Sequence, residues 1–194
     1  MGYFHKPRLA PTEQHLSRRR LLRIGALATT IGMCPHLALA NSRRARTPEK
    51  SLAFYNAHTG EKLKRTYWSR GKYVPDALRD INRILRDHHS DEIRPIDPDL
   101  LDLLYSLGKT IDVSEPFHVL SAYRSPVTNA LLRQYNPRVA EHSMHIEGKA
   151  VDIKLPGRSL AAAWRAAMAL RSGGVGYYPE ANFIHVDTGP VRYW

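Results

Sequence analysis

Runs of apolar residues with strand or helix periodicity divide the first half of the chain into short elements. Residues 52–56 and 62–67 flank the turn signal His58-Thr59-Gly60, and this combination predicts a β-hairpin. A helix is predicted to open at Pro75, because apolar residues recur from there at helical spacing. A second helix is predicted to begin near Asp97-Pro98. These elements indicate a scaffold that carries little chemistry.

The second half of the chain has the same mixture of periods. We predict a strand at 117–122, a short helix at about 128–134 and a strand at 150–154. Ser159 can cap a helix that runs to Arg171 and packs on the sheet. Residues 183–187 alternate again and predict a closing strand.

The first forty residues differ from this pattern and predict a secretory signal. Arg18, Arg19 and Arg20 precede an uncharged stretch at 24–40 that ends in Ala-Leu-Ala, a small-residue cleavage pattern. Paired arginines before a moderately apolar segment are typical of a twin-arginine signal, which would place the mature chain in the periplasm. The alternative, a membrane anchor, is disfavoured because the apolar run is too short and too broken to span about 30 Å of hydrocarbon.

Composition and charge restrict what the rest of the chain can be. The 194 residues are 43% hydrophobic and 24% charged, which suits one globular domain at 51–194 after a flexible lead-in at 41–50. The single Cys34 lies in the leader, so disulfides cannot hold the fold together. Beyond residue 40 the excess of positive charge is six, which favours an anionic partner such as cell wall rather than nucleic acid, or serves only solubility.

A metal site is predicted from residues 143–155, SMHIEGKAVDIKL, together with the closing strand. Alternation in the predicted strand turns Asp152 away from the apolar face, and Gly148 permits a tight turn that brings His145 back over it. His185 can supply a third ligand. Two nitrogens and one oxygen suit Zn²⁺ and leave the fourth position for water, which is the arrangement of a catalytic zinc site. The expected chemistry is metal-assisted hydrolysis, with an amide as the target.

Two further side chains are candidates for catalysis. Asp187 faces the same side of its strand as His185 and is predicted to act as the general base; its alternatives are to organise the turn at 187–189 or to orient His185. Arg124 follows the strand at 117–122, where its donor fork can hold a carboxylate or a developing oxyanion. His142 can either reach the site or lie on the surface beside it. The adjacent His88 and His89 are expected to be loop surface.

The segments SAYRSPVTN, HIEGKAVD and GGVGYYPEANFIHVDTG resemble the zinc D-Ala-D-Ala peptidase family, and more closely its murein endopeptidase K branch, from about Leu52 to Trp194. The resemblance implies an α+β fold in which an antiparallel sheet carries the zinc site and packs against helices. It also implies zinc ligation by His145, Asp152 and His185 and a substrate or transition-state role for Arg124. Many relatives carry a catalytic acid three residues before the last histidine, where this chain has Asn182.

The leading hypothesis is therefore an exported zinc endopeptidase that hydrolyses the peptide crosslinks of peptidoglycan, with the peptide stems as its partner. One alternative is a D,D-carboxypeptidase or dipeptidase that trims free stems. Another is a non-catalytic zinc-bearing module that binds the cell wall, which the departure at Asn182 keeps open. The pattern specifies neither the crosslink that is cleaved nor the oligomeric state.

Overall fold

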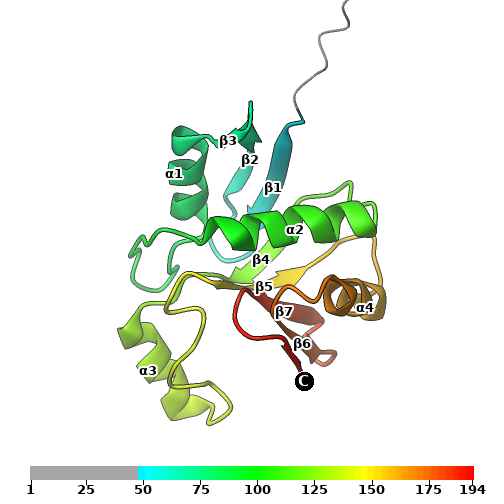
Figure 1. Cartoon of the computed structure of the whole chain (residues 1–194). Coiled ribbons are helices and arrows are strands. Elements are labelled where there is room, and N and C mark those ends of the chain that lie inside the picture. The colour runs from blue at the N-terminus through cyan, green and yellow to red at the C-terminus, as the bar shows by residue number, and fades with distance from the viewer. Residues whose placement is uncertain (1–47) are drawn as a thin grey trace, which may run out of the picture. The chain divides into compact units, whose positions relative to one another are not determined.

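A computed structural model describes residues 48–194 (Figure 1). The predicted leader at 1–40, with its twin-arginine motif, lies outside the described residues. In chain order the described part contains β1 (Lys50–Asn56), β2 (Lys62–Ser69), β3 (Lys72–Tyr73), α1 (Pro75–Ile84), α2 (Pro98–Thr110), β4 (Phe117–Ser121), α3 (Pro126–Tyr135), β5 (Ala150–Lys154), α4 (Leu160–Leu170), β6 (Gly174–Tyr178), β7 (Phe183–Asp187) and β8 (Arg192–Tyr193). The predicted hairpin is β1 and β2.

All the strands join one sheet in the order β3-β2-β1-β4-β5-β7-β6-β8. The central strands β4, β5, β7 and β6 pair antiparallel, as expected, but β1 pairs with β4 and β6 with β8 in parallel. The sheet is therefore mixed rather than antiparallel throughout. Two strands and two helices, β2, β3, α1 and α2, lie between β1 and β4 and form a connection long enough to return the chain to the same end of the sheet.

Caps explain where the helices begin. The Asp97 side chain accepts a hydrogen bond from the backbone of Asp99 at the start of α2, and Ser159 caps α4 in the same way, both at predicted positions. The helix α3 begins at Pro126, two residues earlier than predicted. Ser125 is its cap and accepts from the backbone N–H of Thr128, so the proline occupies the first helical position, where no N–H is needed.

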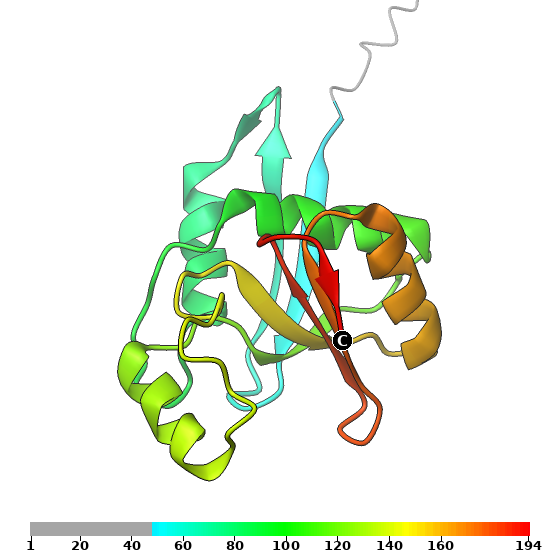
Figure 2. The same ribbon diagram turned by 60° about the horizontal axis from the view of Figure 1, so that its bottom comes forward.

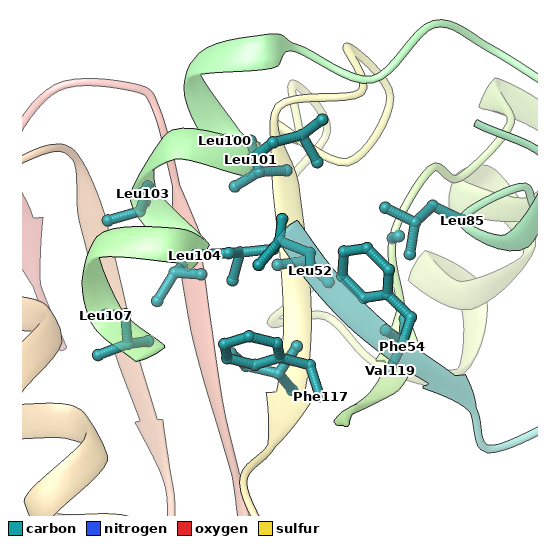
Figure 3. Packing of buried hydrophobic residues seen from close by; sticks show 14 of the residues in the cluster. Leu52, Phe54, Leu85, Leu100, Leu101, Leu103, Leu104, Leu107, Phe117 and Val119 are labelled. Atoms are coloured by element: carbon teal, nitrogen blue, oxygen red, sulfur yellow. The ribbon is translucent and has the colours of Figure 1, made fainter. Parts of the chain in front are cut away.

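One face of the sheet carries the hydrophobic core. The helix α2 lies across it, and Figure 3 shows its leucines directed at apolar side chains of the strands. The buried side chains in this layer include Leu100, Leu101, Leu103, Leu104 and Leu107 of α2 and Leu52, Phe54, Phe117 and Val119 of the sheet. Because this face is closed by helix packing, polar side chains that project from the sheet gather on the opposite face.

The helix α3 stands apart from α4 in both views of the ribbon (Figures 1 and 2). The segment that follows α3 returns to the sheet and leads into β5. A long loop therefore borders the face of the sheet opposite to the core, which we call the open face. Within residues 48–194 no helix combines the length and apolarity that crossing a bilayer would require.

Candidate metal centre

A row of paired residues crosses the four central strands and builds the site. Ser121 on β4 pairs with Asp152 on β5, Asp152 pairs with His185 on β7, and His185 pairs with Gly176 on β6. Paired residues project to the same face of a sheet. The pairing of β4 with β5 is irregular between Val119 and Ser121. This bulge turns Ser121 to the open face although Val119, two residues earlier, lies in the core.

The three predicted metal ligands converge at this row. His185 Nδ1 lies 2.9 Å from Asp152 Oδ1, and His145 Nε2 lies 3.4 Å from Asp152 Oδ2. The two ring nitrogens are 3.2 Å apart. Ligand atoms around a tetrahedral zinc ion with bonds of about 2.0 to 2.1 Å are separated by about 3.3 Å. The donor types and their spacing therefore fit Zn²⁺ without rearrangement of the backbone.

His145 reaches the row from the loop that precedes β5. Its Nδ1 lies 2.7 Å from the carbonyl oxygen of Ala122, which makes Nδ1 the protonated nitrogen and leaves the Nε2 lone pair for a metal. The loop depends on Gly148, which has φ of +71° and lies so close to another loop that a Cβ would stand 2.5 Å from the carbonyl oxygen of Pro95. Only glycine fits this turn.

His185 is held from behind by Asp187. The other ring nitrogen of His185, Nε2, lies 2.9 Å from Asp187 Oδ2, so Nδ1 is the nitrogen directed at Asp152. Asp187 is fully buried, and its carboxylate accepts hydrogen bonds from the backbone N–H groups of Gly174 and Gly189 and from two nitrogens of Arg192. All its acceptor capacity is used within the protein.

This geometry does not favour the predicted role of Asp187 as general base. Its carboxylate lies on the far side of the His185 ring from Asp152, and it does not line the cavity at the metal ligands. The alternative considered from the sequence, orientation of His185, matches the contacts. Asn182, at the position where many relatives carry an acid, has a left-handed backbone and lines a different pocket beside His118 and Lys154.

Burial and mutual contacts perturb all three metal-ligand candidates. Burial lowers the pKa of His145. Burial alone would raise the pKa of Asp152, but its contacts with the two imidazoles outweigh that effect and hold it well below its usual range. Burial opposes the charge on His185, yet the carboxylates of Asp152 and Asp187 raise its pKa to about 9. A positive charge on His185 is thus favoured between the carboxylates of Asp152 and Asp187. A metal ion can bind at Nδ1 of His185 only after this nitrogen has lost its proton.

The metal-ligand candidates open into a cavity of about 530 Å³, which we call the main cavity. Arg124 lines it, with one guanidinium nitrogen 3.9 Å from Asp152 Oδ2, so this predicted site residue does join the trio. His142 also lines the main cavity, whereas His88 and His89 lie in a separate pocket.

Tyr178, Arg192 and Trp194 line the cavity although the sequence did not single them out. Trp194 places its ring 5.3 Å from that of His185 and donates from Nε1 to the hydroxyl of Tyr178 at 2.8 Å. Gly176, opposite His185, makes room for this ring, since a Cβ there would stand 2.7 Å from it. Arg192 joins the wall beside them. The sequence signal that could have indicated this part of the cavity is the alternation of β6, which places glycine at 174 and 176 and tyrosine at 178 on one face.

Comparison with known proteins agrees with this site. A family model described as peptidoglycan L,D-endopeptidase MepK matches residues 44–194. Peptidoglycan L,D-endopeptidase MepK of Escherichia coli (strain K12) is 38% identical over 178 residues, which span 92% of this chain and 97% of that protein. Probable peptidoglycan L,D-endopeptidase MepK of Haemophilus influenzae is 37% identical over 180 residues, which span 92% and 95%. The chain therefore belongs to the peptidoglycan L,D-endopeptidase MepK family.

Proposed function

We propose that this protein is an exported zinc metallopeptidase that hydrolyses L,D peptide crosslinks of peptidoglycan. The observation that carries the proposal is the convergence of His145, Asp152 and His185, with donor atoms within 4.8 Å of one another at the end of a cavity. The family relatives are named for this activity. The leader at 1–40 supports export through the twin-arginine route to the periplasm, where the peptide stems are found.

In this proposal His145 Nε2, Asp152 and His185 Nδ1 hold the zinc ion. The Ala122 carbonyl and the Asp187 carboxylate fix the two rings so that these nitrogens face inward. A bound zinc ion supplies a Lewis acid that polarises a carbonyl group and activates water. The two rings keep their orientation because each is hydrogen-bonded through its other nitrogen, to the Ala122 carbonyl or to the buried Asp187.

Arg124 is proposed to stabilise the negative charge that develops on the scissile carbonyl oxygen. Its guanidinium is held by the hydroxyl of Ser121 at 3.3 Å and the side-chain oxygen of Asn129 at 3.2 Å. These contacts use two of five N–H donors, so others remain free to bind substrate. A fixed cation in a largely buried position is most effective where charge appears only in the transition state.

For the general base we propose His142. The cavity wall within residues 48–194 holds no Asp or Glu besides Asp152, which is already placed as a ligand. Apart from the ligands His145 and His185, its remaining ionisable groups are three arginines, which stay charged, a tyrosine and His142. An imidazole can act first as a base and then as an acid, so His142 can take a proton from the attacking water and return it to the leaving amine.

The test is mass spectrometry of crosslinked muropeptides incubated with the purified chain and zinc. We expect masses of separated stems, with hydrolysis stopped by a chelator and by His185→Ala in a protein that keeps its circular dichroism spectrum. Hydrolysis by a zinc-free His185→Ala sample would contradict the mechanism. Trimming of uncrosslinked stems alone would indicate the carboxypeptidase, and binding to cell wall without new chain ends would indicate the non-catalytic module.

A further inference from the structure

A second pocket shares part of its wall with the main cavity. Its volume is about 200 Å³, and Arg124 and Leu132 line both. The rest of its wall comes from the β1–β2 turn, the segment after α1, the end of β4 with the residues that follow it, and the start of α3. We call it the histidine pocket, because His58, His88 and His89 form one side of it.

The imidazoles of His58 and His88 are stacked, and the ring of His89 lies beside them at a tilt. The rings of His58 and His88 are nearly parallel, with an interplanar angle of 5° and centroids 3.8 Å apart. The ring of His89 lies 4.1 Å from that of His88. Within residues 48–194 no ring nitrogen of the three has a hydrogen-bond partner, and none of these nitrogens is among the buried, unpartnered atoms. Polar edges that are both unpartnered and accessible are available to a ligand.

Buried hydrogen bonds fix the backbone that carries this stack. The side-chain oxygen of Asn56 accepts from the backbone N–H groups of His58 and Thr59, and its amide donates to the carbonyl of Ile84. Asp87 accepts from the backbone N–H of His89 and from that of Ser125, the residue after Arg124. The pocket is thereby preformed and tied to Arg124.

The chemistry of the pocket suits a carboxylate. Arg124 contributes a permanent positive charge with unused N–H donors, and each neutral imidazole has one N–H donor. Burial, followed by the neighbouring His58 and His89, lowers the pKa of His88 to about 4, so His88 is neutral near pH 7. Both oxygens of Asp87 accept backbone N–H groups, which reduces its repulsion of a second carboxylate. A metal ion is disfavoured because the nitrogens of parallel stacked rings do not converge.

We infer that the histidine pocket is a substrate subsite in which Arg124 and the imidazoles of His58 and His88 bind a free carboxylate of the peptide stem beside the scissile bond. The inference rests on the proposed function, because peptidoglycan stems carry free carboxylates next to their crosslinks. A volume of about 200 Å³ accommodates the end of one amino acid. The shared position of Arg124 places that carboxylate next to the metal ligands, so the subsite selects which stem enters the main cavity.

The test compares two crosslinked peptides that differ in one group, a free carboxyl or a carboxamide on the residue beside the scissile bond. Wild-type protein with zinc should favour the free acid by about tenfold in kcat/KM, a typical effect of one charge-assisted contact. In His58→Ala/His88→Ala this preference should fall below about twofold through a higher KM for the free acid. His118→Ala is the matched control, since that ring packs edge to face against Tyr55 outside the pocket, and should keep the preference.

Calorimetric binding of the same two peptides to chelator-treated protein separates this inference from the proposed function. A carboxylate preference in this binding, together with no hydrolysis of either peptide by the zinc-loaded wild-type protein, would leave the subsite and contradict the endopeptidase. Hydrolysis of both peptides at equal rates by wild-type protein, or an undiminished preference in the double variant, would overturn the subsite. If the double variant does not fold, His58→Ala alone is measured instead, because it changes an exposed turn residue. The ratio of kcat/KM for the two peptides then decides in the same way.

Discussion

His145 and His185 present different ring nitrogens to Asp152, and each has its other nitrogen fixed. His145 uses Nε2 because Nδ1 is bonded to the Ala122 carbonyl, and His185 uses Nδ1 because Nε2 is bonded to Asp187. A neutral histidine that donates through one nitrogen offers the lone pair of the other. The two partners therefore decide which nitrogen of each ring is free for an ion, and in His185 that nitrogen must first lose its proton.

Asp187→Asn distinguishes an orienting role of Asp187 from the role of a general base. The asparagine keeps the shape but can present its NH₂ group to His185 Nε2, which would place the proton on Nδ1. We expect metal affinity to fall by about 10- to 100-fold, with activity recovered at saturating zinc. Zinc titration of the activity measures both. If activity stays low when the metal site is full, Asp187 takes part in proton transfer.

His142→Ala tests the base that we propose. Loss of a general base typically lowers kcat by about 10²- to 10⁴-fold, and the zinc content should stay at the wild-type level because His142 is not a ligand. Added imidazole should restore part of the lost rate, an effect that a structural role of the side chain would not give. His118→Ala serves as the control. A variant with wild-type kcat would exclude His142 from catalysis.

At the scale of elements, the strand pattern predicted most of the site. Alternation placed Asp152 on the open face of β5 and both His185 and Asp187 on one side of β7, and the structure agrees. The alternation of residues along a strand does not show, however, how deeply each side chain is buried. Asp187 lies behind the His185 ring rather than in the cavity because β8 returns in parallel beside β6 and brings Arg192 over it.

Two local features escaped the pattern for physical reasons. The bulge before Ser121 turns this side chain to the other face of the sheet. A prediction from strict alternation along the strand assumes that no bulge occurs. The sequence predicts that α3 starts at about residue 128, whereas capping by Ser125 begins the helix at Pro126. The mixed sheet likewise depends on which strands become neighbours, and local sequence does not specify this.

Gly148→Ala should show how strongly the loop before β5 depends on its turn. Alanine adds a Cβ that meets the carbonyl oxygen of Pro95, and Gly157→Ala is the matched control because its φ of +75° is similar but its surroundings are open. We expect Gly148→Ala to destabilise the protein by about 1 to 3 kcal/mol more than the control, the usual cost of overpacking. Urea unfolding of both variants measures the difference; equal losses would mean that the loop accommodates the methyl group.

At the scale of the molecule, the site is assembled from segments that lie far apart in the chain. Arg124 follows β4, His145 precedes β5, and His185 lies near the end of the described chain. Sequence spacing identified these side chains as suitable ligands and donors, and the resemblance to the family, since confirmed, supplied the fold that brings them together. The histidine pocket was not expected, because His58 and His88 are 30 positions apart and only the packing of two loops stacks them.

Asp87 is the buried group that connects these loops to the site, and its ionisation should appear in the pH dependence of stability. Only 1% of its surface is exposed, and burial alone would raise its pKa. Hydrogen bonds from the Thr128 side chain and from Ser125 and His89 outweigh burial and hold the pKa well below its usual range. A carboxyl whose pKa is lowered on folding stabilises the protein above its unfolded pKa of about 4, and this contribution is lost as the pH falls through the folded value.

Asp87→Asn removes that charge but keeps the shape. Its NH₂ group must face one of the backbone N–H donors, so we expect a loss of about 1 to 3 kcal/mol near pH 7. Because only the wild-type protein loses this contribution in acid, the two stabilities should approach each other as the pH falls below about 4. Urea unfolding at pH 7, 5 and 3 measures the difference. A difference that stays constant over this range would show that the charge of Asp87 does not hold the loops together.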